Sequence, residues 1–453
     1  MPPPEPCAMQ PADLIIAARW IVPVEPEGQV LNDHALVVRD GRIVDLLPTA
    51  EATRRYAAVA LVRRPNHVLL PGLVNAHTHS PMTLFRGFAD DMPLSAWLGQ
   101  HIWPAEARWV DAGFVRDGAE LAMLEMLRGG TTCFNDMYFF PDVVARAVDA
   151  SGLRACIGMI VLEQPTVWAQ NAEEYLRKGL AVRDQFRGHP RISMVFAPHA
   201  PYTVADSSFR QIQLLANELD TQIHMHVHET ADEIAESERR FSRRPLQRLD
   251  EMGLLTPLLA AVHMTQLLPE EIALLRERGV SVVHCPESNL KLASGFCPVA
   301  ELASAGINIA LGTDGAASNN DLDMFGEMRS CALLAKGVAQ RADVAPAAAV
   351  LSMATLNGAK ALGLDDRIGS LLPGKEADVI CVDLSAPATQ PVYDPVSHLV
   401  YAASRNQVSD VWVAGRQLLA DGQPLLAESA LILARAEAWR ARLSATPESV
   451  ADD

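Results

Sequence analysis

The sequence predicts an α/β fold: a (β/α)8 TIM-like barrel with a small β-sandwich domain formed by the N- and C-terminal segments. Between Pro71 and about Gly363, short stretches rich in Val, Ile and Ala alternate with longer amphipathic ones, which is the pattern of βα units around a parallel sheet. Both ends of the chain instead show short strands joined by glycine turns. The length of 453 residues accommodates one large barrel and one smaller domain.

The eight predicted barrel strands are short and apolar. They span residues 72–76, 131–135, 154–158, 192–197, 222–227, 260–262, 281–283 and 307–312. Amphipathic helical patterns lie between them, for example over residues 114–128, 172–186, 206–219 and 270–278. Eight such units predict a closed barrel over residues 71–365.

The terminal segments predict a second domain. Isolated hairpins are marginal in water, so residues 12–70 and 366–425 are expected to fold together beside the barrel. Residues 426–453 are expected to form a C-terminal helix and tail, because residues 427–443 are rich in Ala, Leu, Arg and Glu and contain no Gly or Pro. Residues 1–11 lack the basic start and apolar core of a signal peptide and are expected to be a loose tail.

Composition excludes several classes of protein. A net charge of −17 opposes binding to nucleic acid. No apolar run approaches the roughly 20 residues that span a bilayer, so no membrane segment is expected. Seven cysteines, an odd number without a Cys-x-x-Cys pair, argue against a disulfide framework or a thiolate zinc site. These observations predict a soluble, cytoplasmic protein.

Residues that can bind a metal or move a proton follow the barrel strands, whose C-terminal ends build the active site in this fold. His77 and His79 follow the first strand and lie two apart in extended chain, so both imidazoles can reach one ion. The fifth strand carries His224, His226 and His228, which alternate and are expected to face inward at different depths. Not all three can bind the same ion.

We choose His226 as the ligand, because Glu229 then lies one turn beyond it and can reach a metal-bound water without being a ligand. His224 is interpreted as a buried structural histidine, and the role of His228 is left open. The next candidates are His263 after the sixth strand and Asp314 after the eighth.

Taken alone, these last two would be an ordinary loop histidine and a helix-capping aspartate. Together with the other histidines, Asp314 supplies a fourth ligand and His263 a second group for proton transfer.

The combined motifs resemble the amidohydrolase superfamily, in the branch of chlorohydrolases and adenosine-type deaminases. The resemblance rests on Pro71-Gly-Leu-Val-Asn-Ala-His-Thr-His79, Gly129-Gly-Thr-Thr132, His226-x-x-Glu229, His263, Gly312-Thr-Asp-Gly315 and residues 369–378.

The resemblance implies one divalent metal, Zn²⁺ or alternatively Fe²⁺, bound by His77, His79, His226 and Asp314. It also implies that Glu229 shuttles protons and that His263 and Asp314 assist the attacking water. Relatives with two metals use a lysine inside the barrel, and the third and fourth strands contain none. A single metal is therefore expected.

Within this branch the chain looks most like the deaminases of 5′-methylthioadenosine and S-adenosylhomocysteine. By that resemblance Trp97 packs on the nucleoside, Glu106 accepts hydrogen bonds from the ribose hydroxyls, and His199 contacts the purine edge. The alternatives are an exposed helix-start charge for Glu106 and a packing role at the rim for His199.

One departure bears on the substrate. Relatives that take S-adenosylhomocysteine carry arginines after the third strand, whereas residues 155–176 contain no Arg or Lys. An unpaired carboxylate there would lose affinity. The stretch offers instead side chains that suit an uncharged thioether, namely Met159, Ile160, Val161, Leu162 and Trp168. The sequence thus predicts deamination of 5′-methylthioadenosine, with S-adenosylhomocysteine or adenosine as weaker substrates.

Other functions remain as alternatives. A triazine-type chlorohydrolase or aminohydrolase, or a guanine-type deaminase, would use the same metal and proton carriers. A non-catalytic scaffold is disfavoured, because all the expected ligands and both proton carriers are present. The partners expected are a small-molecule nucleoside and, by analogy with relatives, further copies of the chain in a homo-oligomer.

Overall fold

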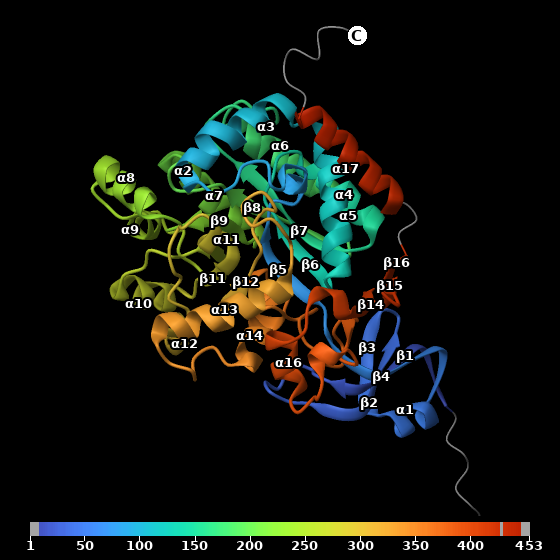
Figure 1. The fold of residues 1–453 in the computed structure, drawn as a ribbon. Coiled ribbons are helices and arrows are strands. Elements are labelled where there is room, and N and C mark those ends of the chain that lie inside the picture. Colours follow the sequence, from blue (N-terminus) through green and yellow to red (C-terminus); the bar gives the residue numbers. More distant parts are fainter. Residues whose placement is uncertain (1–8, 426–428, 445–453) are drawn as a thin grey trace, which may run out of the picture.

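The computed structural model describes residues 9–425 and 429–444, and Figure 1 shows the arrangement of their helices and strands. Eight strands pair in parallel and in chain order. The Asp314 N–H donates to the His77 carbonyl oxygen at 3.0 Å, which ties the chain after the last strand to the first and closes the ring. The predicted barrel is confirmed. Its strands are β5 (Leu73–Thr78), β6 (Thr131–Asp136), β7 (Arg154–Val161), β8 (Ile192–Pro198), β9 (Ile223–Val227), β10 (Leu259–His263), β11 (Ser281–His284) and β12 (Ile309–Leu311).

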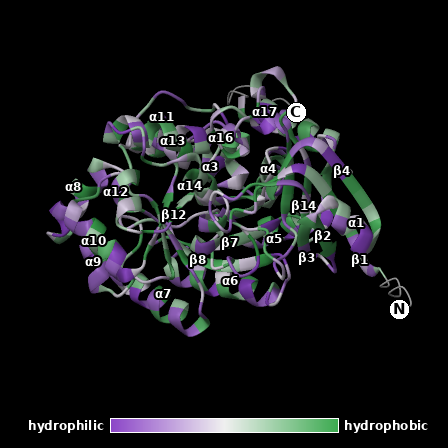
Figure 2. Ribbon diagram, turned by 90° about the horizontal axis from the view of Figure 1, so that it is seen from below, coloured by the Kyte–Doolittle hydropathy of each residue, from purple (hydrophilic) through white to green (hydrophobic). Residues whose placement is uncertain are grey.

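Helices surround the strands, and in Figure 2 many hydrophilic residues lie on the outer helices α8, α9 and α10. The helices around the barrel are α4 (Ala112–Arg128), α5 (Pro141–Ser151), α6 (Ala172–Gln185), α7 (Asp206–Leu219), α8 (Ala231–Phe241), α9 (Pro245–Glu251), α10 (Pro269–Arg278), α11 (Pro286–Lys291), α12 (Val299–Ser304), α13 (Met324–Ala339) and α14 (Ala347–Met353). None of the helices in the described parts of the chain is long and apolar enough to cross a membrane.

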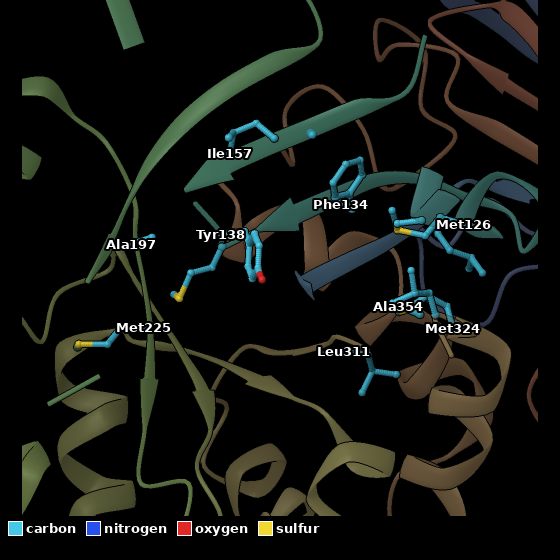
Figure 3. Packing of buried hydrophobic residues seen from close by; sticks show 14 of the residues in the cluster. Met126, Phe134, Tyr138, Ile157, Ala197, Met225, Leu311, Met324 and Ala354 are labelled. Atoms are coloured by element: carbon cyan, nitrogen blue, oxygen red, sulfur yellow. The ribbon is translucent and has the colours of Figure 1, made fainter. Parts of the chain in front are cut away.

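The core has two layers. Side chains that point outward from the strands pack against the helices, among them Phe134, Ile157 and Met225, shown in Figure 3. Inward-pointing side chains are smaller. They form two clusters inside the barrel that include Val74 and Ala76 of the first barrel strand. Helix α15 (Leu356–Ala361) contributes Ala359 and Ala361 to these clusters and so helps to fill the barrel interior.

The second sheet joins the two ends of the chain, as predicted. Its strand order is β16-β15-β14-β13-β4-β1-β2-β3, and β4 pairs with β13 across more than 300 residues of sequence. One apolar cluster includes residues from both halves of this sheet around the fully buried Trp412. The strands are β1 (Gln10–Ile21), β2 (Leu31–Arg39), β3 (Arg42–Pro48), β4 (Tyr56–Pro71), β13 (Val379–Asp383), β14 (Val408–Val413), β15 (Arg416–Ala420) and β16 (Gln423–Pro424).

The two predicted hairpins meet in space. Gly41 and Gly415 lie at their turns with φ of +73° and +75°. A Cβ atom on Gly41 would come within 2.6 Å of the Ala414 carbonyl oxygen, so the close contact of the turns requires glycine there.

Some terminal segments differ from expectation. Gln10 and Pro11 belong to strand β1, so the predicted loose tail is wrong for these two residues, while residues 1–8 lie outside the described residues. Helix α17 (Ser429–Ser444) occupies most of the predicted helix at 427–443, whose residues 427–428, like 445–453, are not described. Helix α16 (Pro395–Tyr401), within the segment assigned to the small domain, packs on α13 and α14.

The remaining short elements lie in connections. They are α1 (Thr49–Arg55), η1 (Ser80–Phe85), α2 (Leu94–Ala96), η2 (Trp97–Ile102), α3 (Trp103–Trp109), η3 (Pro387–Thr389) and η4 (Arg405–Gln407). The run from α2 to α3 lies between the first and second barrel strands and forms part of the wall of the cavity at the barrel mouth.

Candidate active site

Four of the residues singled out in the sequence converge at the C-terminal ends of the barrel strands. His77, His79, His226 and Asp314 each offer one ligand atom, and these atoms all lie within 4.8 Å of one another. Asp314 Oδ1 lies 3.2 Å from Nε2 of both His77 and His79. His226 Nε2 lies 3.2 Å from His77 Nε2. The cluster is almost entirely buried.

A local irregularity brings the first two histidines together. Val74 and Ala76 belong to the interior clusters, so regular strand alternation would point His77 outward. The pairing of β5 with β6 shifts register between Asn75 and Thr78. His77 can therefore reach the interior together with His79.

The outer nitrogens of the histidines fix which atoms face the centre. His79 Nδ1 lies 2.6 Å from the Met137 carbonyl oxygen, and His226 Nδ1 lies 2.7 Å from the His199 carbonyl oxygen. A carbonyl oxygen only accepts, so both Nδ1 atoms carry the proton. In the neutral rings, both Nε2 lone pairs then point into the cluster, as in metal sites where outer hydrogen bonds orient the ligands.

This arrangement fits a divalent metal. His79 Nε2 and Asp314 Oδ1 face each other at 3.2 Å, and their lone pairs repel unless a proton or a cation lies between them. His77 Nε2 lies 3.2 Å from both Asp314 Oδ1 and His226 Nε2. Zinc bonds of about 2.0–2.1 Å in tetrahedral geometry place ligand atoms about 3.3 Å apart. Asp314 Oδ2 accepts from Ser288 Oγ at 2.6 Å and Oδ1 from the Gly315 N–H at 2.8 Å, which fixes the carboxylate. The donor set and its spacing suit zinc.

Two further predicted residues lie beside the cluster. His263 Nδ1 faces Asn289 Oδ1 at 2.9 Å, so Nδ1 holds the proton and Nε2 is free to accept one. That Nε2 lies 3.9 Å from Glu229 Oε1. Burial raises the pKa of the Glu229 carboxyl, which favours its protonated form. The pair has the chemistry of a proton acceptor and a proton donor.

Left-handed backbone turns place these groups. His263 has φ of +77° and Asp314 φ of +63°. Residues other than glycine adopt this conformation rarely, and such strain gathers at functional sites. His263 is the last residue of strand β10, and Asp314 lies three residues after the end of β12, so both left-handed residues lie where a strand gives way to a loop.

The remaining histidines of the fifth strand have separate roles. His224 Nε2 lies 2.8 Å from His77 Nδ1, so this buried histidine holds the ring of a cluster residue. The expectation that His228 faces inward is wrong. Strand β9 ends at Val227, and His228 has φ of +54°, which breaks the alternation. Its Nε2 accepts from the Leu246 N–H on α9 instead.

A cavity of about 670 Å³ opens above the cluster, and the predicted substrate residues Trp97, Glu106 and His199 all line it. Glu106 Oε1 accepts a hydrogen bond from Tyr138 Oη at 2.7 Å. Burial raises the pKa of Glu106 to about 7, against the opposing effect of this hydrogen bond. Burial lowers the pKa of His199 to about 3, so its ring is neutral.

A π-helical turn puts two of these residues on one side. Trp97 and Glu106 are nine positions apart, and in a regular α-helix of 3.6 residues per turn they would face opposite directions. Segment η2 is a π-helix, which has more residues per turn and changes this angular relation. Trp97 also donates from Nε1 to the Ala89 carbonyl oxygen at 3.1 Å, which fixes its indole.

Only part of the apolar stretch after the third barrel strand reaches the cavity. Ile160 and Leu162 line it, whereas the alternate residue Met159 packs against Gly179 of helix α6. Trp168 does not line it either, because its ring packs against Phe140 at 5.1 Å. The expectation for the whole stretch is therefore too broad.

The loop that follows is tied to helix α6. Lys178 Nζ donates to the Trp168 carbonyl oxygen at 2.5 Å and lies 3.0 Å from Glu174 Oε1. Thr166 Oγ1 and Tyr175 Oη are 2.5 Å apart. This lysine is thus occupied outside the cavity, and of the described residues that line the cavity, none is Lys or Arg.

Sequence reasoning missed several supporting residues. Tyr138, Ser288 and Asn289 bond the side chains described above. Glu233 accepts the backbone N–H groups of His228 and Glu229 at 3.1 and 2.7 Å, which holds the turn after β9. Of these four residues, only Glu233 follows a strand with a predicted site residue, since Tyr138 follows β6 and Ser288 and Asn289 follow β11.

A closed barrel whose strand ends gather three histidines, an aspartate and two proton carriers is the arrangement of a metal-dependent hydrolase. The sequence pattern of the amidohydrolase family matches residues 68–418. The chain belongs to the amidohydrolase family.

Similar proteins cover nearly the whole chain. A 5-methylthioadenosine/S-adenosylhomocysteine deaminase of Teredinibacter turnerae is 51% identical over 433 residues, which are 96% of this chain and 98% of that protein. A 5′-deoxyadenosine deaminase of Methanothermobacter thermautotrophicus is 44% identical, with 90% and 95% covered. The crystal structure of an adenosine deaminase from Xanthomonas campestris with bound zinc has a TM-score of 0.95 at 54% identity, covering 96% of this chain and 99% of that one.

Proposed function

We propose that this protein is a zinc-dependent deaminase of adenosine-type nucleosides, and that it converts 5′-methylthioadenosine to 5′-methylthioinosine and ammonia. S-adenosylhomocysteine and adenosine are weaker substrates. One observation carries the proposal. The cavity has the histidine and aspartate cluster at its inner end, Glu106 on its wall, and no Lys or Arg among the described residues that line it. The names of the relatives support a nucleoside altered at its 5′ position.

In this proposal His77, His79, His226 and Asp314 hold one divalent ion, which is zinc, with Fe²⁺ as the alternative. The crystal structure of the Xanthomonas campestris adenosine deaminase, which is 54% identical, contains bound zinc and so supports zinc here. The ion would lower the pKa of water from 15.7 toward about 7 and supply hydroxide near neutral pH.

The protein supplies the proton transfers. Asp314 and His263 accept the proton of the attacking water. Glu229 donates a proton to the ring nitrogen beside the carbon that bears the amino group. It then takes up the second proton from the attacking oxygen and passes it to the departing amine, and the proton held by Asp314 and His263 restores Glu229. A C–O bond forms, the C–N bond breaks, and one water is consumed for each ammonia released. General acid–base catalysis of this kind contributes about 10²- to 10⁴-fold in rate.

The substrate would lie along the cavity. His199, with its neutral ring, contacts the purine edge, and Trp97 packs on the nucleoside. Glu106 accepts hydrogen bonds from the ribose hydroxyls. The apolar side chains of Ile160 and Leu162 contact the uncharged methylthio group.

Two other reactions would use the same histidine and aspartate cluster at the inner end of the cavity. The substrate of a triazine hydrolase or a guanine-type deaminase has no ribose to pair with the acceptor sites of Glu106 that Tyr138 leaves free, and covering these sites without a donor is costly. Replacing Glu106 by Gln should therefore harm a nucleoside substrate far more than a triazine. A purified protein that prefers chlorotriazine or guanine would overturn the nucleoside proposal.

The first experiment is ammonia release by zinc-loaded protein from 5′-methylthioadenosine, S-adenosylhomocysteine, adenosine, guanine and a chlorotriazine. Glu229→Gln should lose about 10²-fold or more of the activity and keep one zinc per chain. The exposed Glu238 on helix α8, which begins two residues after Glu229, is the matched control, and Glu238→Gln should behave as wild type. If all five compounds stay inert while one zinc is bound, the substrate assignment falls.

The cytoplasmic location and the homo-oligomer belong to the same proposal. The six cysteines in the described residues are buried and form no disulfide, which suits a reducing compartment. Sedimentation of the purified chain tests the oligomer.

A further inference from the structure

Three consecutive residues at the end of strand β6, 136–138, connect the metal-binding cluster to the carboxylate on the cavity wall. Asp136 Oδ1 accepts hydrogen bonds from the residues on both sides of His79, at 3.0 and 2.6 Å. The Met137 carbonyl oxygen accepts from His79 Nδ1 at 2.6 Å. Tyr138 Oη donates to Glu106 Oε1 at 2.7 Å. One short segment thus holds groups at both ends of the proposed nucleoside site.

The tyrosine is well placed to fix a carboxylate. Its side chain is buried, with 4% of its surface exposed, and Figure 3 shows it beyond the end of the strand that carries Phe134. Glu106 comes from helix α3, so this hydrogen bond joins two separate segments of the cavity wall.

The geometry of the hydrogen bond leaves most of the carboxylate free. An ionised carboxylate has two oxygens with about four acceptor sites. Tyr138 occupies one site on Oε1, so Oε2 and the remaining site on Oε1 stay available to a ligand. Without the phenol, the Glu106 side chain could rotate, and it would lose a donor in a partly buried environment.

We propose that Tyr138 is the positioning residue that sets the preference for a ribose with free 2′ and 3′ hydroxyls, because it orients Glu106 toward them. This inference rests on the proposed nucleoside deamination. It assigns Tyr138 no contact with the reacting atoms, and the backbone carbonyl of Met137 holds His79 whatever side chain follows.

The test compares two substrates that differ only in the two hydroxyls, 5′-methylthioadenosine and its 2′,3′-dideoxy analogue. In the wild-type enzyme the hydroxyls should lower KM. In Tyr138→Phe, KM for 5′-methylthioadenosine should rise about 10-fold, the effect of losing a hydrogen bond to a charged group. KM for the dideoxy analogue and kcat for both substrates should change little. The ratio of KM for the dideoxy analogue to KM for 5′-methylthioadenosine should therefore fall toward 1.

Two further variants separate positioning from general damage. Glu106→Gln should lower the same ratio of KM values. The double variant, Glu106→Gln with Tyr138→Phe, should have the same ratio as Glu106→Gln alone, because the two residues act as one unit. Tyr202 also lines the cavity, where its ring packs edge-on against His199 at 6.0 Å. Tyr202→Phe removes a hydroxyl from the same cavity and should leave the ratio of the two KM values as in wild type.

The outcomes distinguish the two proposals. If the wild-type enzyme deaminates neither compound, the proposed function and this inference both fail. If it prefers the ribonucleoside and Tyr138→Phe keeps the wild-type ratio, the function stands and the role of Tyr138 is refuted. A variant that loses zinc or melts at a much lower temperature, with kcat falling for both substrates alike, also refutes a role in orienting Glu106 alone. A lower ratio of the two KM values in Tyr138→Phe, with zinc content unchanged, supports the proposed role of Tyr138.

Discussion

A basic residue at the cavity mouth should convert a poor substrate into a better one. Val167 lines the cavity and is 44% exposed, so an arginine there can reach both the ligand and water. S-adenosylhomocysteine carries a carboxylate on its 5′ tail, and no Lys or Arg in the described lining pairs with it. A guanidinium can bind this carboxylate through two parallel hydrogen bonds.

The size of the effect follows from the exposure of the site. A charge-assisted hydrogen bond contributes about 1.5–3 kcal/mol when buried, and exposed ion pairs contribute about 0–1 kcal/mol. For the half-exposed Val167 we take about 1.4 kcal/mol, which is about a tenfold change. Val167→Arg should therefore raise kcat/KM for S-adenosylhomocysteine about 10-fold and leave kcat/KM for 5′-methylthioadenosine nearly unchanged.

The assay is ammonia release from both substrates at low and high salt. The gain in Val167→Arg should shrink at high salt, because screening weakens a partly exposed ion pair. Val167→Gln, similar in length to the inner part of arginine but uncharged, is the control and should show no gain. The reasoning is refuted if the wild-type enzyme already uses S-adenosylhomocysteine as well as 5′-methylthioadenosine, or if the glutamine variant gains as much as the arginine variant.

Four further perturbations test other parts of the molecule. Removing the metal with dipicolinic acid should abolish activity and lower Tm, because the facing lone pairs lose their cation, and added zinc should restore both. His224→Leu should weaken zinc binding about 10- to 100-fold in a chelator competition, since His77 loses the partner of its Nδ1. The pKa of about 7 for Glu106 predicts that the carboxyl is neutral below pH 7, so KM for 5′-methylthioadenosine should fall as pH rises from 6 to 8, and Glu106→Gln should lose this dependence. Arg154 is fully buried and bonds Asp378 and Glu376 near the start of strand β13, so Arg154→Met should lower the free energy of unfolding in urea by about 3–5 kcal/mol.

Each of these has an opposite result that would count against it. Full activity after removal of the metal, or an unchanged zinc affinity in His224→Leu, would contradict the assigned site. A KM that does not vary between pH 6 and 8 would remove Glu106 from binding. Unfolding of Arg154→Met at the wild-type urea concentration would mean that its ion pairs contribute no net stability.

The architecture could be predicted because its signals are local. Alternating apolar strands and amphipathic helices lie next to each other in sequence, and βα units of this kind have few ways to pack. The union of the chain ends followed from a physical requirement, since neither set of hairpins is stable alone. The pairing of β4 with β13 confirms it.

The side-chain directions were harder to predict, because they depend on backbone details that the sequence does not display. Regular alternation suggested that His228 faces inward, but a left-handed turn at that residue ends the pattern. Alternation would also have turned His77 outward, and the register shift in β5 corrects it. The same alternation, applied to residues 159–162, would have separated Ile160 and Leu162 from Met159.

Tyr138 was missed for a different reason. Its partner Glu106 is 32 positions away on another segment, and no local pattern links them.

The inner end of the cavity is built from strand ends of one barrel, whereas the loop at 164–170 is held through Lys178 and Tyr175 of helix α6. None of these tethers involves a residue of the histidine and aspartate cluster. Substitutions in that loop can therefore change which 5′ group is accepted while the proton transfers stay intact, and the loop is where enzymes with this inner site are expected to diverge in substrate.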